Sequence, residues 1–441
     1  MLRFLRQKPE RALAWFSGYE RLRLFGWRLR QSPQFGSWYY SSSESGDQES
    51  ERSQVRKSDL QPVRLMPAMY DVVVAGLGAM GSAAAWQLAR SGQRVLGIDR
   101  FAPPHTLGSS HGESRIIREA YFEHPSYVPL VQRAYELWDE LAAVTRSKLF
   151  IQTGGLMIGA PNGIVVGGAR RSAEMHRLKF EELSANDVAR RFPAIRPAPN
   201  MSAIWEPRAG VLFPESCVAA HLQAAKQAGA TLNIDEQVLR WEPNGNGVRV
   251  VTNKGSYTTG RLVISAGSWA QMLLPDLPLQ LKVERQVLYW FAARNPEVFR
   301  PDKCPIHLWE FAPHRFFYGF PDLGTGVKLA LHHEGEATTT DSVRREVTDE
   351  EIAAMRTAVQ PFFPHLGSEV LKTVVCIYTN TRDEHFLIDS HPTHPQVLIV
   401  SPCSGHGFKF SSAIGEVVRD LVVSGKSRFD LSLFRYRSSV S

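Results

Sequence analysis

The sequence predicts an α/β fold: a discontinuous, doubly wound domain with an inserted antiparallel sheet. Two strand–glycine–helix units support this prediction, one near residue 76 and one near residue 405. Between them the chain alternates strands and helices, as in a parallel sheet covered by helices. At 441 residues the chain exceeds one typical core, so we expect two domains.

The first unit has the order strand, glycine turn, helix, strand and acid. Gly76 permits a tight turn, Gly78 lets the backbone approach a pyrophosphate, and Gly81 lets the helix pack closely on the strand. Asp99 stands where an acid accepts hydrogen bonds from an adenosine ribose. The unit predicts a bound dinucleotide and leaves NAD and FAD open. Its elements are expected at Asp71–Ala75, Ser82–Arg90 and Arg94–Ile98.

The second unit joins the apolar strand Val397–Val400 to an amphipathic helix, Ser411–Val423, through the loop SGHGFKF at Ser404–Phe410. Backbone N–H groups that converge at such a turn can bind an anion, and an ordinary tight turn fits the same residues. A third small-residue turn, Ala266–Trp269, follows the apolar strand Leu262–Ser265.

The positive charge is concentrated at the N-terminus. The chain carries +7, but residues 1–65 hold 12 Lys/Arg and 7 Asp/Glu, which leaves +2 for the rest. A near-neutral body gives no reason to expect a nucleic-acid partner. The first 40 residues are rich in arginine and poor in acids, like a mitochondrial transit peptide. The alternatives are a disordered extension or a start at Met66 or Met69. We expect a mitochondrial protein if the leader is real, and a cytoplasmic or peroxisomal one otherwise.

The order of elements predicts the domain boundaries. Residues 1–65 form a leader and polar linker. The dinucleotide domain takes 66–150, 210–284 and 371–441, and the substrate domain takes 151–209 and 285–370. Aromatic residues between 285 and 335 have strand-like spacing and are expected in a sheet, where they could also wall an apolar cavity.

The sequence predicts neither a metal site, nor a disulfide framework, nor a membrane span. The cysteines Cys217, Cys304, Cys376 and Cys403 are widely spaced. The longest apolar region, Val72–Leu88, is interrupted by glycines.

Five motifs in order carry a resemblance to a known family. From about Tyr70 to about Arg437 the chain resembles the monomeric sarcosine oxidase and N-methyltryptophan oxidase family, FAD-dependent amine oxidases of the D-amino-acid oxidase superfamily. The resemblance implies FAD instead of NAD, and a monomer. The motifs are GSSHGESRIIR (Gly108–Arg118), GVLF (Gly210–Phe213), YGFP (Tyr318–Pro321) with Lys328, CIY (Cys376–Tyr378) with DEHF (Asp383–Phe386), and SGHGFKF.

The resemblance also implies a cofactor site. Cys376 matches the cysteine that bonds covalently to the 8α-methyl group of the flavin, with a buried inert thiol as the alternative. Arg115 is expected to lie against the flavin ring. The expected cofactor-binding residues are Gly76, Gly78, Gly81, Asp99, Arg100, Ser110, His111, Ser114, Arg115, Ala266, Gly267, Cys376, Gly405, Gly407 and Lys409.

The expected substrate site combines cations and aromatic residues. Arg118 and Lys409 are expected to clamp a substrate carboxylate. Arg115 and Arg118 lie three apart and would share one face of a helical turn. Lys328 matches the residue that promotes flavin oxidation by O₂, with a surface lysine as the alternative. Tyr318, Tyr378 and His332 match cavity residues, and His111 and Tyr121 are secondary candidates.

The implied reaction oxidises a secondary amino acid to an imine, which water hydrolyses to an amine and an aldehyde, while O₂ becomes hydrogen peroxide. Two alternatives stay open: a dehydrogenase with another electron acceptor, and a flavin-binding protein with little turnover. Pro402 and Cys403 before the SGHGFKF loop, and Glu119 after Arg118, depart from the family pattern. Pro402 lacks a backbone donor near the expected cofactor, and Glu119 could pair with Arg118.

Overall fold

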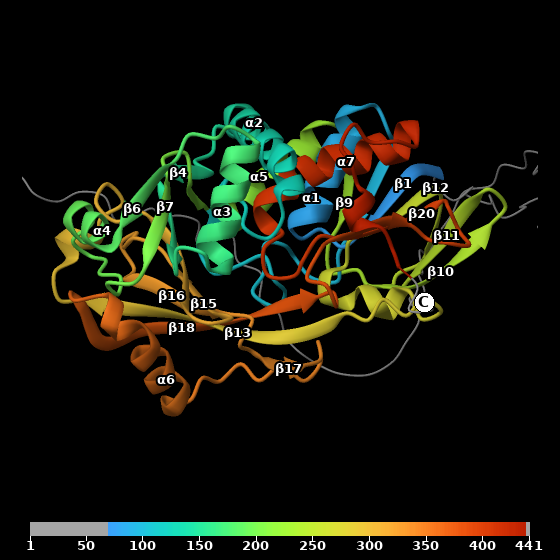
Figure 1. Ribbon diagram of the computed structural model, residues 1–441. Coiled ribbons are helices and arrows are strands. Elements are labelled where there is room, and N and C mark those ends of the chain that lie inside the picture. Colours follow the sequence, from blue (N-terminus) through green and yellow to red (C-terminus); the bar gives the residue numbers. More distant parts are fainter. Residues whose placement is uncertain (1–68, 438–441) are drawn as a thin grey trace, which may run out of the picture. The chain divides into compact units, whose positions relative to one another are not determined.

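The computed structural model describes residues 69–437 (Figure 1). The leader and linker predicted for residues 1–65 lie outside the described residues, so the transit peptide stays a prediction. No helix between residues 69 and 437 is both long enough and apolar enough to cross a membrane.

The first sheet has eight strands and brings together segments from early, middle and late parts of the chain. Strand β1 pairs in parallel with β2 on one edge and β12 on the other, and β12 also pairs in parallel with β20. This arrangement confirms the predicted discontinuous α/β fold. The strands are β1 (Met69–Ala75), β2 (Val95–Ile98), β9 (Thr231–Asn233), β10 (Val238–Asn244), β11 (Gly247–Thr252), β12 (Ser256–Ile264), β19 (Leu387–Ser390) and β20 (Val397–Ser401).

Both faces of this sheet are covered, which explains the apolar run in β1. Val72 and Val74 pack into the core beneath the helices, whereas Val73 and Ala75 pack into the core on the other face. A parallel strand buried on both sides is expected to be apolar throughout. The helices are α1 (Ala79–Arg90), α2 (Val128–Thr145), α5 (Pro214–Gln227) and α7 (Ser411–Ser424).

Helices α1 and α7 pack closely because small residues meet at their contact. A Cβ atom added to Gly415 of α7 would stand 2.6 Å from the carbonyl oxygen of Ala83 in α1. The second strand–glycine–helix unit thus lies directly against the first, although some 330 residues separate them.

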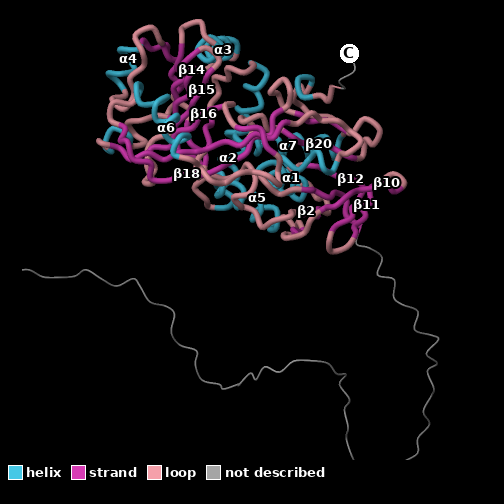
Figure 2. Tube along the Cα trace, turned by 90° about the horizontal axis from the view of Figure 1, so that it is seen from below, coloured by secondary structure: helices cyan, strands magenta, loops and turns pink. Residues whose placement is uncertain are grey.

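The second sheet has nine strands and is largely antiparallel, as the inserted domain was predicted to be. Strands β14 to β16 of this sheet and β10 to β12 of the first lie at opposite ends of the described part (Figures 1 and 2). Its strands are β5 (Gly155–Gly159), β6 (Glu181–Ser184), β7 (Ser202–Glu206), β13 (Lys282–Ala293), β14 (Ile306–Ala312), β15 (Arg315–Gly319), β16 (Val327–His332), β17 (Glu336–Thr338) and β18 (Leu366–Asn380).

Strand β18 crosses the boundary that the sequence placed between residues 370 and 371. It pairs with β13 from Lys282 to Ala293 and so belongs entirely to the nine-stranded sheet. A small third sheet contains β3 (Arg115–Ile117), β8 (Gly210–Leu212) and β4 (Phe150–Gln152). The remaining helices are α3 (Ile164–Met175), α4 (Ala185–Arg191) and α6 (Asp349–Val359), with short 3₁₀ turns at Pro125–Tyr127, Gly267–Leu273, Pro296–Phe299, Gln360–Phe362, Phe408–Phe410 and Ser432–Phe434.

Candidate active site

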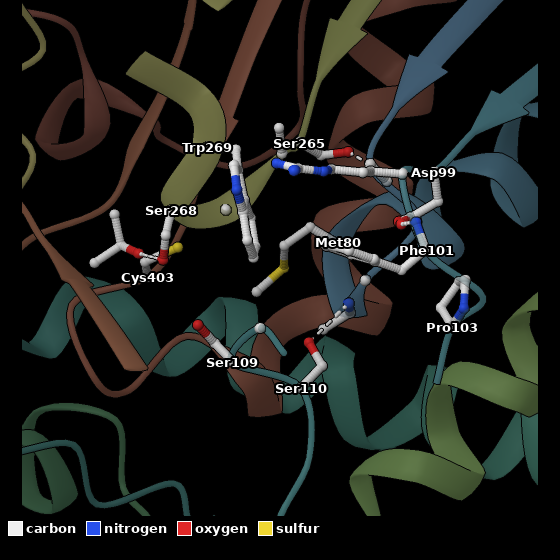
Figure 3. A pocket seen from close by; sticks show the side chains of 18 of the residues that line it. Met80, Asp99, Phe101, Pro103, Ser109, Ser110, Ser265, Ser268, Trp269 and Cys403 are labelled. Carbon is white, nitrogen blue, oxygen red and sulfur yellow. Dashed lines mark hydrogen bonds between the residues drawn. The ribbon is translucent and has the colours of Figure 1, made fainter. Parts of the chain in front are cut away.

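A cavity of about 400 Å³ opens where β1, β12 and β20 end. Met80, Asp99, Ser110, Trp269 and Cys403 surround it (Figure 3). Ligands of doubly wound sheets bind outside the carboxyl ends of the strands, and the cavity has this position. Ten of the predicted cofactor-binding residues line it: Gly76, Gly78, Asp99, Arg100, Ser110, Arg115, Ala266, Gly267, Gly405 and Gly407.

The glycines of the first unit are required by close backbone contacts. Gly76 has φ = +93°, and a Cβ atom there would lie 2.6 Å from the carbonyl oxygen of Ser265. A Cβ atom at Gly81 would lie 1.7 Å from the carbonyl oxygen of Gly76. Gly81 therefore acts through packing, as predicted, and does not line the cavity itself.

Asp99 shapes the turn at this end of the cavity. Its carboxylate accepts hydrogen bonds from the backbone N–H groups of Leu77 (2.6 Å) and Phe101 (2.8 Å). Burial raises the pKa of Asp99, although both backbone donors act against this shift.

The cavity has polar features that FAD can satisfy. The indole N–H of Trp269 is buried and has no partner within the described chain, and Trp269 lines the cavity. The first turn of α1 has no side-chain cap from Gly78, and the Ala79 N–H reaches the Ser110 hydroxyl at 3.1 Å. A helix start with available N–H groups is suited to a pyrophosphate. The residues present therefore fit a bound FAD.

Cys376 lies beside the cavity, next to the lining residue Ile377, and is buried. The Arg115 guanidinium approaches its sulfur to 3.5 Å. Burial alone would raise the pKa of the Cys376 thiol, but nearby His111 and the charge of Arg115 outweigh burial and lower the pKa to about 7. A thiolate is the nucleophilic form of cysteine, so this thiol can react near neutral pH.

Arg115 and Arg118 do not share a helical face, and that prediction was wrong. Arg115–Ile117 form strand β3, paired with β8, and side chains three apart on a strand point to opposite faces. Arg115 consequently reaches Cys376, whereas Arg118 turns towards Glu123.

Arg118 is buried in an ion pair that the sequence analysis missed. Its Nη2 atom donates to both carboxylate oxygens of Glu123 at 2.7 Å, and its Nη1 atom donates to the Ala120 carbonyl at 2.9 Å. Glu119, the neighbour suspected of pairing with Arg118, instead pairs with Arg208 at 2.8 Å. No motif marks Glu123, because its contact depends on the backbone turn after β3.

Lys409 lies near this pair, and both belong to one cationic cluster. Its ammonium donates to the His406 carbonyl at 2.6 Å and to the Tyr121 hydroxyl at 3.3 Å. Burial and the charge of Arg118 lower the pKa of Lys409 to about 7, although Glu123 acts to raise it. Neither Arg118 nor Lys409 is among the residues that line the large cavity.

Lys328 is buried, which rules out the surface-lysine alternative. Its Nζ atom reaches the Gly112 carbonyl (2.6 Å) and both the carbonyl and hydroxyl oxygens of Ser114 (3.0 Å each). Burial and the charge of Arg115 lower its pKa well below the usual value. Lys328 also lines a second cavity of about 260 Å³.

The three predicted aromatic site residues lie together. The His332 Nδ1 atom is 3.1 Å from the Tyr378 hydroxyl, and the Tyr318 and His332 rings are 5.9 Å apart. A Cβ atom at Gly405, where φ = +75°, would come within 2.8 Å of both Tyr378 and His332. The loop of the second unit thus faces this aromatic group. Pro402 lines the large cavity, so its missing donor lies at the cavity wall.

Glu215 is a second residue that the sequence analysis missed. Its carboxylate accepts the backbone N–H groups of Gly112 (2.7 Å) and Glu113 (3.1 Å), which fixes the loop between His111 and Arg115. Its place in the first turn of α5, after the GVLF motif, is the available signal.

The fold and the cavity define a dinucleotide-dependent oxidoreductase. Residues 71–421 match the family described as FAD dependent oxidoreductase. Monomeric sarcosine oxidase of Streptomyces avermitilis is 45% identical over 374 residues, covering 84% of this chain and 97% of that protein. N-methyl-L-tryptophan oxidase of Salmonella dublin is 34% identical over 372 residues, covering 83% and 98%. The chain belongs to this FAD-dependent oxidoreductase family and, within it, to the sarcosine and N-methyltryptophan oxidase group, which confirms the resemblance.

Solved structures agree at the level of the fold. NikD, described as an unusual amino acid oxidase essential for nikkomycin biosynthesis, matches with a TM-score of 0.73 at 24% identity, covering 85% of this chain and 98% of NikD. L-proline dehydrogenase from P. horikoshii matches with a TM-score of 0.72 at 21% identity, covering 84% and 97%.

Proposed function

We propose that this flavoprotein oxidises N-methyl or other secondary amino acids and transfers the electrons to O₂, with hydrogen peroxide as product. The observation that carries the proposal is the gathering of three buried cations, Arg115, Arg118 and Lys409, with an aromatic group at the flavin end of the cavity. Such cations favour a ligand carboxylate. The curated relatives are named for substrates of this class.

The chain's own residues have binding and orienting roles in this proposal. Bound FAD supplies the acceptor for two electrons from the substrate C–N bond. Lys409 and Arg118 hold the carboxylate, which sets the position of the amine. Burial lowers the pKa of His332 well below its usual value, so a neutral imidazole and the Tyr378 hydroxyl face the substrate. A neutral polar wall favours the uncharged amine, which is the form that can be oxidised.

We assign Lys328 to the reaction with O₂. Its charged form would stabilise negative charge that develops on O₂. Because burial lowers its pKa, this assistance is expected to fall as pH rises. In Lys328→Met, substrate should still bleach the flavin without air, and reoxidation by O₂ should slow at least tenfold.

A substrate panel tests the proposed function. Sarcosine, N-methyl-L-tryptophan, L-proline and L-pipecolate are mixed with the purified protein without air, with glycine as the primary-amine control. We expect a secondary amino acid to bleach the flavin, and air to restore its colour with one hydrogen peroxide per turnover. Bleaching without peroxide would instead indicate the dehydrogenase. No bleaching by any compound would indicate a flavin-binding protein.

The covalent bond to Cys376 is a separate part of the proposal. Flavin should stay with acid-precipitated protein and be released from Cys376→Ala. Because the thiol pKa is about 7, attachment of FAD to flavin-free protein should quicken roughly tenfold between pH 6 and pH 8, as the thiolate fraction grows. Flavin colour left in the supernatant of the parent protein would contradict the bond.

A further inference from the structure

A chain of hydrogen bonds runs from Lys409 through two residues to the backbone. The Tyr121 hydroxyl lies 3.3 Å from Lys409 Nζ and 2.5 Å from His406 Nδ1, and His406 Nε2 lies 3.0 Å from the Glu384 carbonyl oxygen. Tyr121 is fully buried, and His406 and Lys409 are 7% and 5% exposed. The proposed function uses only the lysine.

The direction of each hydrogen bond follows from the last acceptor. The Glu384 carbonyl can only accept, so His406 carries its hydrogen on Nε2 and presents a bare Nδ1. Burial lowers the pKa of His406 to about 3, so the ring is neutral and keeps this tautomer. The Tyr121 hydroxyl must then donate to Nδ1, although the His406 carbonyl also lies 3.4 Å away.

This direction leaves the lone pairs of the Tyr121 oxygen for Lys409. The ammonium has three hydrogens, and the described structure gives two of them acceptors: the His406 carbonyl (2.6 Å) and the Tyr121 oxygen. The third hydrogen is left for a ligand. A proton relay does not fit this arrangement, because the chain ends on a carbonyl that cannot take up a proton.

We propose that Tyr121 and His406 are positioning residues that orient the Lys409 ammonium towards the substrate carboxylate. This inference rests on the proposed role of Lys409 as part of the carboxylate clamp. His406 acts through Tyr121, and neither residue needs to touch the substrate.

The charges around Lys409 make pH a useful second measurement. Arg115 and Arg118 act to lower its pKa and Glu123 acts to raise it, while His332 faces the same space from β16 and is neutral. A hydroxyl that accepts from the ammonium favours the charged form. Loss of this hydroxyl should therefore weaken carboxylate binding more at pH 8 than at pH 6.

The test measures the Kd of methoxyacetate for the flavin-loaded enzyme from the change in flavin absorbance. Methoxyacetate has the shape of sarcosine but no amine to oxidise. Lys409→Met should weaken binding at least tenfold. Tyr121→Phe and His406→Leu should each weaken it roughly tenfold, because a hydrogen bond to a charged group is lost or misdirected. His406→Asn, which keeps an acceptor near the Nδ1 position, should stay within twofold of the parent.

Tyr127→Phe is the matched control, because this neighbouring tyrosine bonds His385 at 3.1 Å and should bind methoxyacetate as the parent does. In the Lys409→Met background, Tyr121→Phe should have less than a twofold further effect. Parent-like binding by both Tyr121→Phe and His406→Leu, or a full effect of Tyr121→Phe without Lys409, would overturn the positioning role. If Lys409→Met itself binds normally, the clamp in the proposed function fails first.

Discussion

The ion pair between Arg118 and Glu123 has a strong influence on ligand binding at the residue scale. Arg118 is 1% exposed, and its guanidinium is stacked against the rings of Tyr121 and Phe122 at 4.3 and 4.7 Å. A substrate carboxylate that binds Arg118 must share or replace Glu123. The protein's own carboxylate thus competes with the substrate for this cation.

We predict that Glu123→Gln destabilises the protein without ligand and increases the stabilisation that a carboxylate ligand gives. Removal of one partner from a buried pair leaves an uncompensated charge, at a cost of about 3–5 kcal/mol. Methoxyacetate can restore a negative charge beside Arg118. Thermal unfolding with and without methoxyacetate measures both effects. Glu136→Gln, which removes a carboxylate from an exposed pair with Arg133, should change neither, and an equal ligand effect in parent and Glu123→Gln would contradict the competition.

Sequence reasoning found the cations of the site but not their partners. Arg115, Arg118, Lys328, Lys409 and Cys376 stand in motifs, so their chemical types and order could be recognised. The partners Glu123 and Glu215 are set by the three-dimensional path of the loops around β3. Charge spacing between Arg115 and Arg118 suggested a helix, because a three-residue strand leaves too short a pattern to be detected.

At the scale of elements, the turn from β1 to α1 depends on the absence of a side chain at Gly76. Gly76 and Gly92 have similar positive φ angles, +93° and +86°, but only Gly76 has atoms where a Cβ would stand. The pair therefore separates two costs of an added methyl group, backbone strain and collision.

We predict that Gly76→Ala loses bound FAD and unfolds at a lower temperature than Gly92→Ala. Both variants carry the strain of a positive φ, on the order of 1–2 kcal/mol, but only Gly76→Ala must push the Ser265 backbone out of the cavity wall. Flavin content per chain and thermal unfolding are the measurements. Equal flavin content in the two variants would show that the close contact at Gly76 is unimportant.

The elements of the dinucleotide-binding part could be predicted well from the sequence. The expected strands Asp71–Ala75 and Arg94–Ile98 correspond to β1 and β2, because long apolar runs between glycines have few other solutions. Strand β18 was not assigned to its sheet, because its N-terminal half alternates with exposed residues and its partner β13 lies some 80 residues earlier.

At the scale of the whole molecule, Glu206 connects the nine-stranded sheet to the turn that follows β3. Its carboxylate ends β7, is 1% exposed, and accepts the backbone N–H groups of Glu119 (2.7 Å) and Ala120 (2.7 Å). Burial raises the pKa of Glu206 to about 7, although these two donors act against the shift.

We predict that Glu206 makes the free energy of unfolding decrease as pH rises from about 4.5 to 7. The folded state holds this proton more tightly than the unfolded state, so the stabilisation is complete below the unfolded pKa and is lost as pH rises through the folded pKa. The change is on the order of 3 kcal/mol. Denaturant unfolding of the parent and Glu206→Gln at pH 5 and pH 8 measures it.

Relative to the parent, Glu206→Gln should gain stability at pH 8. Glu182→Gln serves as the control, since Glu182 is partly exposed and pairs with Arg170. A parallel pH dependence in the parent and Glu206→Gln would contradict the prediction.

The contact between α1 and α7 has a consequence for the order of biosynthesis. The first nucleotide-binding unit leaves the ribosome early, but β20 and α7, which complete its sheet and cover its helix, leave among the last residues of the chain. During translation the apolar surface of α1 must wait, uncovered, for nearly the whole protein to be made. Stable retention of the cofactor is therefore a post-translational event, and loss of α7 by premature termination should yield a protein without flavin even though every residue of the glycine turn is present.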